Sequence, residues 1–195
     1  MARQVELFWD AGSTNSYFAL KLIPPLVARH GAQLILRPFN LGYVFRHHNY
    51  TLMDEPTAKL ANRKRDLKRW AQRYGLPFRM PDVFPIKTSV AMRGAIAMRR
   101  WSRELEFVDA LLRAYWEQND HRIAELDHLA EIAARLGVAS DDFVAETESD
   151  AVRQVLIDST NEGLDRGVFG APTTVVDGEL YWGKDRLEFI EDALR

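Results

Sequence analysis

The chain of 195 residues has the length of one domain, and its 47% hydrophobic residues suffice for a sizeable core. Its 26 Lys and Arg against 28 Asp and Glu leave a net charge of -2, which gives no global field to recruit nucleic acid or an anionic membrane. The absence of cysteine excludes disulfides, thiolate metal sites, a cysteine nucleophile and a dithiol redox cycle. If the protein carries out thiol chemistry, the thiol must therefore come from another molecule.

The charge is divided unevenly along the chain. Residues 1–103 hold 18 Lys or Arg and 6 Asp or Glu, a charge of +12, whereas residues 104–195 hold 8 and 22, a charge of -14. Such asymmetry is typical of a nucleic-acid surface, or of one half that receives a small anion. The small anion is favoured, because no RNA-binding aromatic motif accompanies the basic residues.

The first elements predicted are a strand, a helix and a second strand. The apolar run at 5–9 predicts a buried strand, and no secretory signal precedes it, so we expect a cytoplasmic protein. A helix begins at Ser13 or Ser16 and ends at Gly31, with a kink or break at the prolines 24–25. Residues 33–39 predict the second strand, parallel to the first. No apolar stretch reaches the roughly 20 residues that span a bilayer, so no membrane association is expected.

Helical periodicity dominates the middle of the chain, and sheet returns at its end. The predicted helices cover residues 57–73, 88–101, 104–118, 123–136 and 147–166. A hairpin of strands 173–176 and 179–182 with an Asp-Gly turn follows, and then a closing helix over 184–194. This order predicts an α/β, thioredoxin-like fold with a large all-helical insertion. The predicted units are a thioredoxin-like domain of residues 1–42 and 168–195 and an inserted helical domain of residues 43–167.

Two serines stand where the first strand passes into the first helix. The N-terminus of a helix presents free backbone amides and about half a positive charge, which stabilise an anion or thiolate. In thioredoxin-like oxidoreductases this position holds Cys-x-x-Cys, whereas this chain has Ser13 and Ser16. Taken alone, the spacing favours two helix-capping serines.

A second segment, around Ala171 and Pro172, comes just before the hairpin. A proline at the entry of a strand marks an edge or tight turn, and a cis peptide bond is one option there. In a thioredoxin-like sheet this loop faces the N-terminus of the first helix. A cis bond would then leave the amide and carbonyl of Ala171 free to pair with an extended ligand.

Eight short motifs in this order resemble the 2-hydroxychromene-2-carboxylate isomerase family, relatives of kappa-class glutathione transferases in the DsbA-like thioredoxin group. The resemblance covers nearly the whole chain. The motifs are FWDAGS at 8–13, RPFNLG at 37–42, DLKRW at 66–70, YGLPF at 74–78, FPI at 84–86, AMRGA at 91–95, GVFGAPT at 167–173 and GKDRL at 183–187. The resemblance implies a DsbA-like fold, a homodimer and glutathione as a catalytic cofactor.

The resemblance also implies residue roles. Ser13 would be the catalytic residue, its hydroxyl donating to the glutathione sulfur and favouring the thiolate. The backbone of Ala171, before Pro172, would hold the cysteinyl part. Lys184 and Asp185 match positions that take the γ-glutamyl end, where Asp185 can pair with the ammonium.

Two further positions match polar residues of the family. Asn49 and Lys59 correspond to an asparagine and a lysine that face the tripeptide or the substrate carboxylate. The implied reaction is isomerisation of a small aromatic carboxylate in the breakdown of naphthalene-like compounds. Glutathione would add to the ring-opened substrate, permit rotation about the bond made single, and leave.

Other functions remain open on the sequence. They are a kappa-like transferase that conjugates electrophiles, a non-catalytic thioredoxin-like binding module and, least favoured, a nucleic-acid binder using the basic face of residues 59–73. Without the resemblance, Lys184 and Asp185 would be assigned only to capping the last helix. His47 and His48 suggest a surface loop and no metal site, because adjacent histidines point apart. Trp116 is assigned to the core, with a substrate pocket as its alternative.

The chain departs from the family pattern at two positions. Thr14 stands where the family often has proline, and Asn62 stands where it has tyrosine. Thr14 removes a preference for starting a helix and removes no hydrogen-bond donor, so we expect glutathione binding to survive. Asn62 is expected to alter the shape of the pocket, which leaves the electrophile undefined.

Overall fold

The structure is a computed structural model that describes residues 3–51 and 54–195. The described strands are β1 (Gln4–Trp9), β2 (Gln33–Pro38), β3 (Thr173–Val176) and β4 (Glu179–Trp182). The described α-helices are α1 (Thr14–Arg29), α2 (Leu41–His47), α3 (Thr57–Tyr74), α4 (Ser89–Ala97), α5 (Glu104–Trp116), α6 (Leu126–Arg135), α7 (Ser140–Glu148), α8 (Asp150–Asp165) and α9 (Leu187–Leu194). Two short 3-10 helices, η1 (Met98–Trp101) and η2 (His121–Ala124), lie between them.

The strands form one mixed sheet in the order β2-β1-β3-β4. β1 and β2 are parallel, with Val5 opposite Leu34, and β3 runs antiparallel to both β1 and β4. The β3–β4 turn is Asp177-Gly178, and both residues have positive φ, 50° and 87°, as a two-residue hairpin turn requires. The predicted strands and hairpin are therefore confirmed, as is the thioredoxin-like order of elements.

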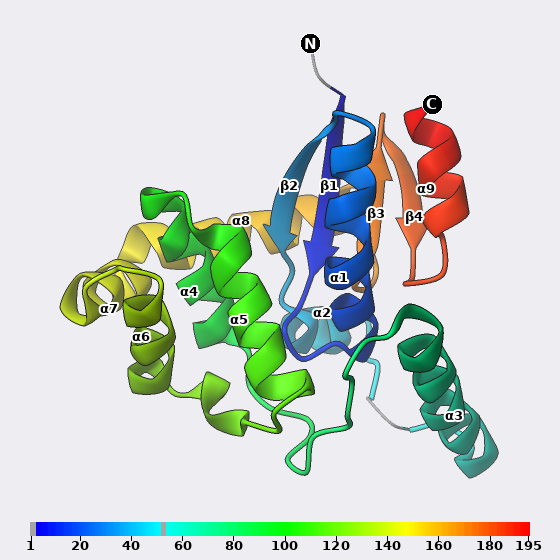
Figure 1. Cartoon of the computed structure of the whole chain (residues 1–195), viewed down its shortest axis with the longest axis horizontal. Helices are drawn as coiled ribbons and strands as arrows, with labels where there is room; N and C mark the ends of the chain where they lie inside the picture. Colours follow the sequence, from blue (N-terminus) through cyan, green and yellow to red (C-terminus); the bar gives the residue numbers. More distant parts are fainter. Residues whose placement is uncertain (1–2, 52–53) are drawn as a thin grey trace.

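Helices cover both faces of the sheet (Figure 1). α1 and α9 lie over one face, α8 crosses behind the other, and α4 to α7 pack together at one side. Phe8 and Phe39 fill the space under α8, with ring centroids 5.8 Å apart. Gly163 of α8 permits this close approach, because a Cβ there would lie 2.7 Å from the Phe39 ring.

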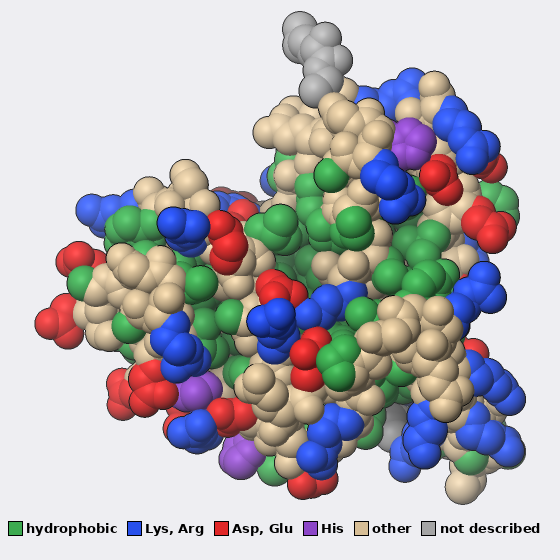
Figure 2. All heavy atoms as spheres, in the orientation of Figure 1, with side chains coloured by type: hydrophobic (Ala, Val, Ile, Leu, Met, Phe, Trp, Pro, Cys, Tyr) green, Lys and Arg blue, Asp and Glu red, His purple; other side chains and the backbone are tan. Residues whose placement is uncertain are grey.

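The core continues from the sheet into the helical region. Buried side chains of β1, such as Leu7 and Trp9, belong to the same apolar cluster as Phe107 and Leu129 of the helices. The described helices include none that is long and apolar enough to cross a bilayer. Lys and Arg side chains gather over α3, at the lower right of Figure 2.

Three expectations about the helices are corrected. α1 continues through Pro24 and Pro25 without the break that was one of the two expectations, because its buried face, including Ile23 and Leu26, holds both turns against the core. α9 begins at Leu187, after the turn that holds Lys184. The predicted helix over 147–166 is two helices, α7 and α8, that meet at Ser149.

Sequence periodicity also missed α2. Seven residues are too few to show a helical repeat, and the side chain of Asn40 caps this helix by accepting from the Tyr43 amide at 3.1 Å. The exposed His47 ends α2, so it lies on a helix, whereas a surface loop was predicted there.

Candidate active site

Ser13 lies in the tight turn that joins β1 to α1. It is the N-cap residue of α1, and its Oγ accepts a hydrogen bond from the Ser16 amide at 3.2 Å. The Ser13 amide in turn donates to the Asp10 carbonyl at 3.0 Å. Because the first-turn amides of a helix carry partial positive charge, the hydroxyl stands in a field that favours a nearby anion.

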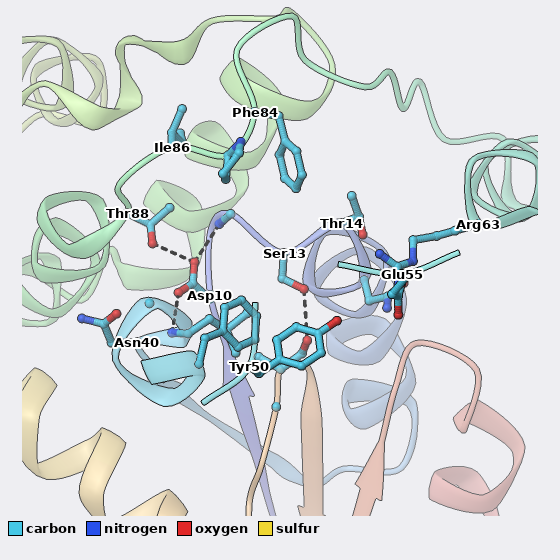
Figure 3. Close-up of a pocket in the computed structure, with 18 of the residues that line it drawn as sticks. Asp10, Ser13, Thr14, Asn40, Tyr50, Glu55, Arg63, Phe84, Ile86 and Thr88 are labelled. Atoms are coloured by element: carbon cyan, nitrogen blue, oxygen red, sulfur yellow. Dashed lines mark hydrogen bonds and ion pairs between the residues drawn. The ribbon is translucent and has the colours of Figure 1, made fainter. Parts of the chain in front are cut away.

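The Ala171 loop faces this turn, and the Ala171–Pro172 peptide bond is cis. The Ser13 hydroxyl donates to the Ala171 carbonyl at 3.0 Å, which Figure 3 shows as a dashed line. The expectation of a free Ala171 carbonyl is thus wrong, because Ser13 already uses it as an acceptor. The Ala171 amide has no acceptor within residues 3–51 and 54–195 and remains able to donate.

Ser13 and Ala171 lie in a cleft of about 1120 Å³. This volume slightly exceeds the roughly 300–1,000 Å³ of common small-molecule sites, so the cleft has room for a ligand of two parts. In Figure 3, Phe84 and Ile86 lie on one side of Ser13 and Tyr50 on the other. Other apolar side chains of the lining are Phe45, Leu60, Leu67, Met80, Phe169 and Trp182.

Basic side chains form another part of the lining. Lys59 of α3 contacts Glu55 with an Nζ to Oε1 distance of 3.0 Å, and Arg63 pairs with the same carboxylate. The hydrogen bond from Lys59 lowers the pKa of Glu55, which therefore stays ionised. Three more cations line the cleft and form no ion pair within the described residues, namely Arg46, Lys64 and Lys87.

The structure brings together three of the predicted site residues, since Ser13, Lys59 and Ala171 all line the cleft. Pro172 lies beside it, and its carbonyl accepts from the Gly183 amide at 2.9 Å. This bond connects the Ala171 loop to the turn that holds Lys184.

Lys184 and Asp185 are not part of the cleft lining. Lys184 is 8% exposed, its Nζ donates to Asp66 at 3.0 Å, and it lies 4.6 Å from the centroid of the Trp70 ring. The ammonium group therefore links the C-terminal turn to α3. Asp185 is half exposed and pairs with its neighbour Arg186 at 3.0 Å.

Three other residues considered from the sequence lie outside the lining. Asn49 is exposed with φ of 52°, and Asn62 is exposed on α3. Trp116 is fully buried, and its indole Nε1 donates to the Ala11 carbonyl at 2.9 Å. It therefore belongs to the core, as predicted, and supports the turn before Ser13.

Sequence reasoning assigned no role to Asp10, although this carboxylate lies at the base of the cleft. Asp10 is 2% exposed and accepts hydrogen bonds from Gly12, Leu41 and Thr88. Its place directly after a buried strand was the available signal. No group of three or more His, Asp or Glu that could hold a metal ion is found in the described part of the chain.

The chain is similar to known proteins over nearly its whole length. Residues 4–195 match the DSBA-like thioredoxin domain. The 2-hydroxychromene-2-carboxylate isomerase of Pseudomonas putida is 33% identical, with 97% of this chain and 93% of that protein covered. The enzyme of the same name from Sphingobium xenophagum is 28% identical over 100% of this chain and 99% of its own length.

More distant relatives extend the family. Glutathione S-transferase kappa 1 of Caenorhabditis elegans is 26% identical over 98% of this chain and 91% of its own length. Among solved structures, a 2-hydroxychromene-2-carboxylate isomerase superposes with a TM-score of 0.85 at 25% identity, covering 98% of this chain and 94% of that one. The chain therefore belongs to the DsbA-like thioredoxin family and, within it, to the group of 2-hydroxychromene-2-carboxylate isomerases and their kappa glutathione transferase relatives.

Proposed function

We propose that this protein is a glutathione-dependent isomerase of a small aromatic carboxylate, of the 2-hydroxychromene-2-carboxylate type. One observation carries the proposal. The Ser13 hydroxyl stands at the N-terminus of α1, bonded to the Ala171 backbone, in a cleft with an apolar and basic lining. The isomerases among the relatives support this activity, and the kappa transferases support the cofactor.

The Ser13 end of the cleft suits a thiolate. A thiol with a pKa of about 8.5 is only a few per cent ionised at pH 7. The Ser13 hydroxyl, together with the first-turn amides of α1, would stabilise the ionised form at this position. Thr14 and Asn15, the first residues of that helix, also line the cleft. The sequence thus supplies thiolate stabilisation without a cysteine of its own.

The Ala171 backbone suits the cysteinyl part of a peptide thiol. Ser13 has one hydroxyl proton, so donating it to a sulfur means releasing the Ala171 carbonyl. The cysteinyl N–H of glutathione would replace that donor, and the Ala171 amide would bind the cysteinyl carbonyl. The hydrogen bond that the Ser16 amide donates to Ser13 Oγ would be kept during this exchange.

The remaining predicted residues are assigned to the ends of the tripeptide. Asp185 would pair with the γ-glutamyl ammonium, with the turn of Pro172 and Lys184 beside it. Lys59 would bind a carboxylate in place of, or together with, its Glu55 contact. Asn49, which lies outside the cleft lining in the structure, would face the tripeptide or the substrate carboxylate.

Bound glutathione would supply a thiolate that adds reversibly to the conjugated substrate, which permits rotation before the thiolate leaves again. The cations Arg46, Lys64 and Lys87 would attract the substrate carboxylate. Phe84, Ile86 and the other apolar side chains would pack on the aromatic ring and exclude water from it.

Product analysis tests the proposal against a kappa-like transferase. The purified chain is supplied with 2-hydroxychromene-2-carboxylate, with and without glutathione. Isomer formation that requires glutathione and leaves its concentration unchanged supports the isomerase. Loss of glutathione in proportion to substrate shows a transferase. If calorimetry detects no binding of glutathione, the third candidate, a non-catalytic binding module, is supported.

The family relationship also motivates two proposals about context. We propose that the protein works as a homodimer and that it acts in the cytoplasm on naphthalene-like breakdown products. Light scattering tests the first, and cell fractionation with specific antibodies tests the second.

A further inference from the structure

One buried carboxyl group joins three segments of the cleft. Asp10 directly follows β1, and its Oδ1 accepts from the Gly12 amide at 2.8 Å and from the Thr88 hydroxyl at 2.8 Å. Its Oδ2 accepts from the amide of Leu41, the first residue of α2, at 2.9 Å. Figure 3 shows these bonds converging on Asp10 below Thr88.

Each of these three partners lies in a different segment of the cleft lining. Gly12 lies in the turn that presents Ser13. Leu41 starts α2, which contributes Phe45 to the lining, and Thr88 ends the segment that contributes Phe84 and Ile86. Asp10 therefore joins the Ser13 turn, which is the thiol end of the cleft, to α2 and to the segment of Phe84 and Ile86, which form its apolar end.

The Thr88 side chain is turned towards Asp10 and not towards its own helix. Thr88 is the N-cap residue of α4, a position where a threonine usually caps its own helix. Its side chain makes no such cap bond, and its hydroxyl donates to Asp10. Burial raises the pKa of Asp10 above its ordinary value, and the three hydrogen bonds offset only part of this rise. The three hydrogen bonds, from two backbone amides and one hydroxyl, hold the Asp10 carboxyl group in one orientation.

We propose that Asp10 is a positioning residue that holds the Ser13 turn in register with α2 and with the segment of Phe84 and Ile86. The two ends of the cleft then act on one ligand. The inference rests on the proposed function, because the thiol end is assigned to glutathione. It predicts that cutting the Thr88 bond alone misaligns the apolar end and spares the thiol end.

The test compares two probes by calorimetry on the full chain. Glutathione reports the thiol end, whereas S-benzylglutathione reports both ends. In Thr88→Val, which has the same shape without the hydroxyl, S-benzylglutathione affinity should fall about tenfold while glutathione affinity changes less than about twofold. Thr88→Ser retains the hydroxyl and should restore the affinity.

Thr147→Val is the matched control. Thr147 is fully buried in α7, and its hydroxyl has no partner within the described residues. This variant should bind both probes as the parent chain does. Equal binding of S-benzylglutathione by Thr88→Val and the parent, or an equal loss for both probes, overturns the inference.

Asp10→Asn tests the centre of the network without a ligand. An amide group cannot accept on both sides, so the Gly12 or Leu41 amide loses its acceptor and should exchange with solvent at least about tenfold faster. Unchanged exchange of both amides overturns the inference. If Asp10→Asn does not fold, the Thr88 variants decide alone. If the parent chain binds neither probe, the proposed function fails, whereas amide exchange in Asp10→Asn still tests the hydrogen bonds of Asp10.

Discussion

The cleft has two walls that are built differently. The Ser13 wall is held by buried polar contacts, among them Trp116 to the Ala11 carbonyl at 2.9 Å and Ser13 to Ala171 at 3.0 Å. Another wall is α3, a basic helix whose only buried residues in the structure's described part are Leu67 and Ala71. One wall is thus fixed from inside the core, and the other lies against the molecule from outside.

The contacts of α3 with the rest of the fold are few and partly exposed. Asp66, which is 40% exposed, receives the Lys184 ammonium, and the Trp70 ring lies 6.4 Å from that of Phe18. Segments with few buried apolar contacts open at a lower free-energy cost than core elements. The Ser13 wall, to which the thiol chemistry is assigned, is therefore expected to open at a higher free-energy cost than the α3 wall, which contributes to ligand fit. Three predictions test this contrast, and a fourth concerns a carboxylate away from both walls.

The largest effect is expected from Ser13→Ala. Loss of one donor to a developing or bound anion typically costs about 10²–10³-fold in kcat. The N-cap bond to Ser16 is lost as well, which lowers the free energy of unfolding by about 1 kcal/mol, and the loss of the donor to the Ala171 carbonyl lowers it by about 1–3 kcal/mol more. Steady-state kinetics and denaturant unfolding measure the two effects separately.

Ser149→Ala is the matched control. Ser149 caps α8 by accepting from the Val152 amide at 3.2 Å, the same distance as in the Ser13 cap. This variant should lose only the stability of a cap bond, about 1 kcal/mol, and keep its activity. Equal kcat values in the two alanine variants would show that Ser13 only caps a helix.

A smaller effect is expected from Trp116→Phe, which removes a buried hydrogen bond of the Ser13 wall. The Ala11 carbonyl loses its indole donor, at a cost of about 1–3 kcal/mol in the free energy of unfolding. Trp9→Phe provides the comparison, because Trp9 is equally buried and its Nε1 has no partner among the described residues. Denaturant unfolding should show the greater loss for Trp116→Phe. Identical losses would indicate that ring volume alone matters at both positions.

The α3 wall is tested with Lys184→Met. This change removes the Asp66 contact and the position of the ammonium over Trp70, and should cost about 1 kcal/mol, because Asp66 is partly exposed. Hydrogen exchange should accelerate in α3 and stay unchanged in α1. Lys68→Met, at an exposed position of α3 without an ion pair in the described residues, is the control. Faster exchange in α1 would contradict the separation of the walls.

The smallest effect is expected away from both walls, at Asp120. The hydrogen bond from Arg122 lowers the pKa of Asp120 from 3.8 to about 2. A lowered carboxyl pKa stabilises the folded state above pH 3.8, and this contribution disappears as the pH falls towards 2. Asp120→Asn should therefore lose well under about 1 kcal/mol at neutral pH and flatten the acid limb of the stability curve. An unchanged acid limb would contradict the assignment.

Much of the fold followed from local patterns. The strands, the Asp-Gly turn and α3 were predicted because alternation, turn residues and helical periodicity are properties of neighbouring residues. The missed α2 and the division at Ser149 are short or polar elements, whose ends are set by capping bonds rather than by apolar repeats.

The site was less predictable than the fold. Ser13 and Ala171 were found because two motifs at known places in a fold face each other. Asp10 was missed because its importance depends on Leu41 and Thr88, which are 31 and 78 residues away in sequence. Similarly, the burial of Lys184 against Trp70 depends on how α3 packs, which its own sequence does not encode.

The bond between Ser13 and Ala171 bears on which thiols the protein would accept. A thiol whose sulfur accepts the hydrogen bond of the Ser13 hydroxyl leaves the Ala171 carbonyl without its donor, at a cost of about 1–3 kcal/mol. A peptide thiol offers its own N–H in exchange, and a simple thiol such as 2-mercaptoethanol has none to offer. With glutathione as the proposed cofactor, the Ala171 carbonyl would therefore favour it over thiols that lack an N–H group.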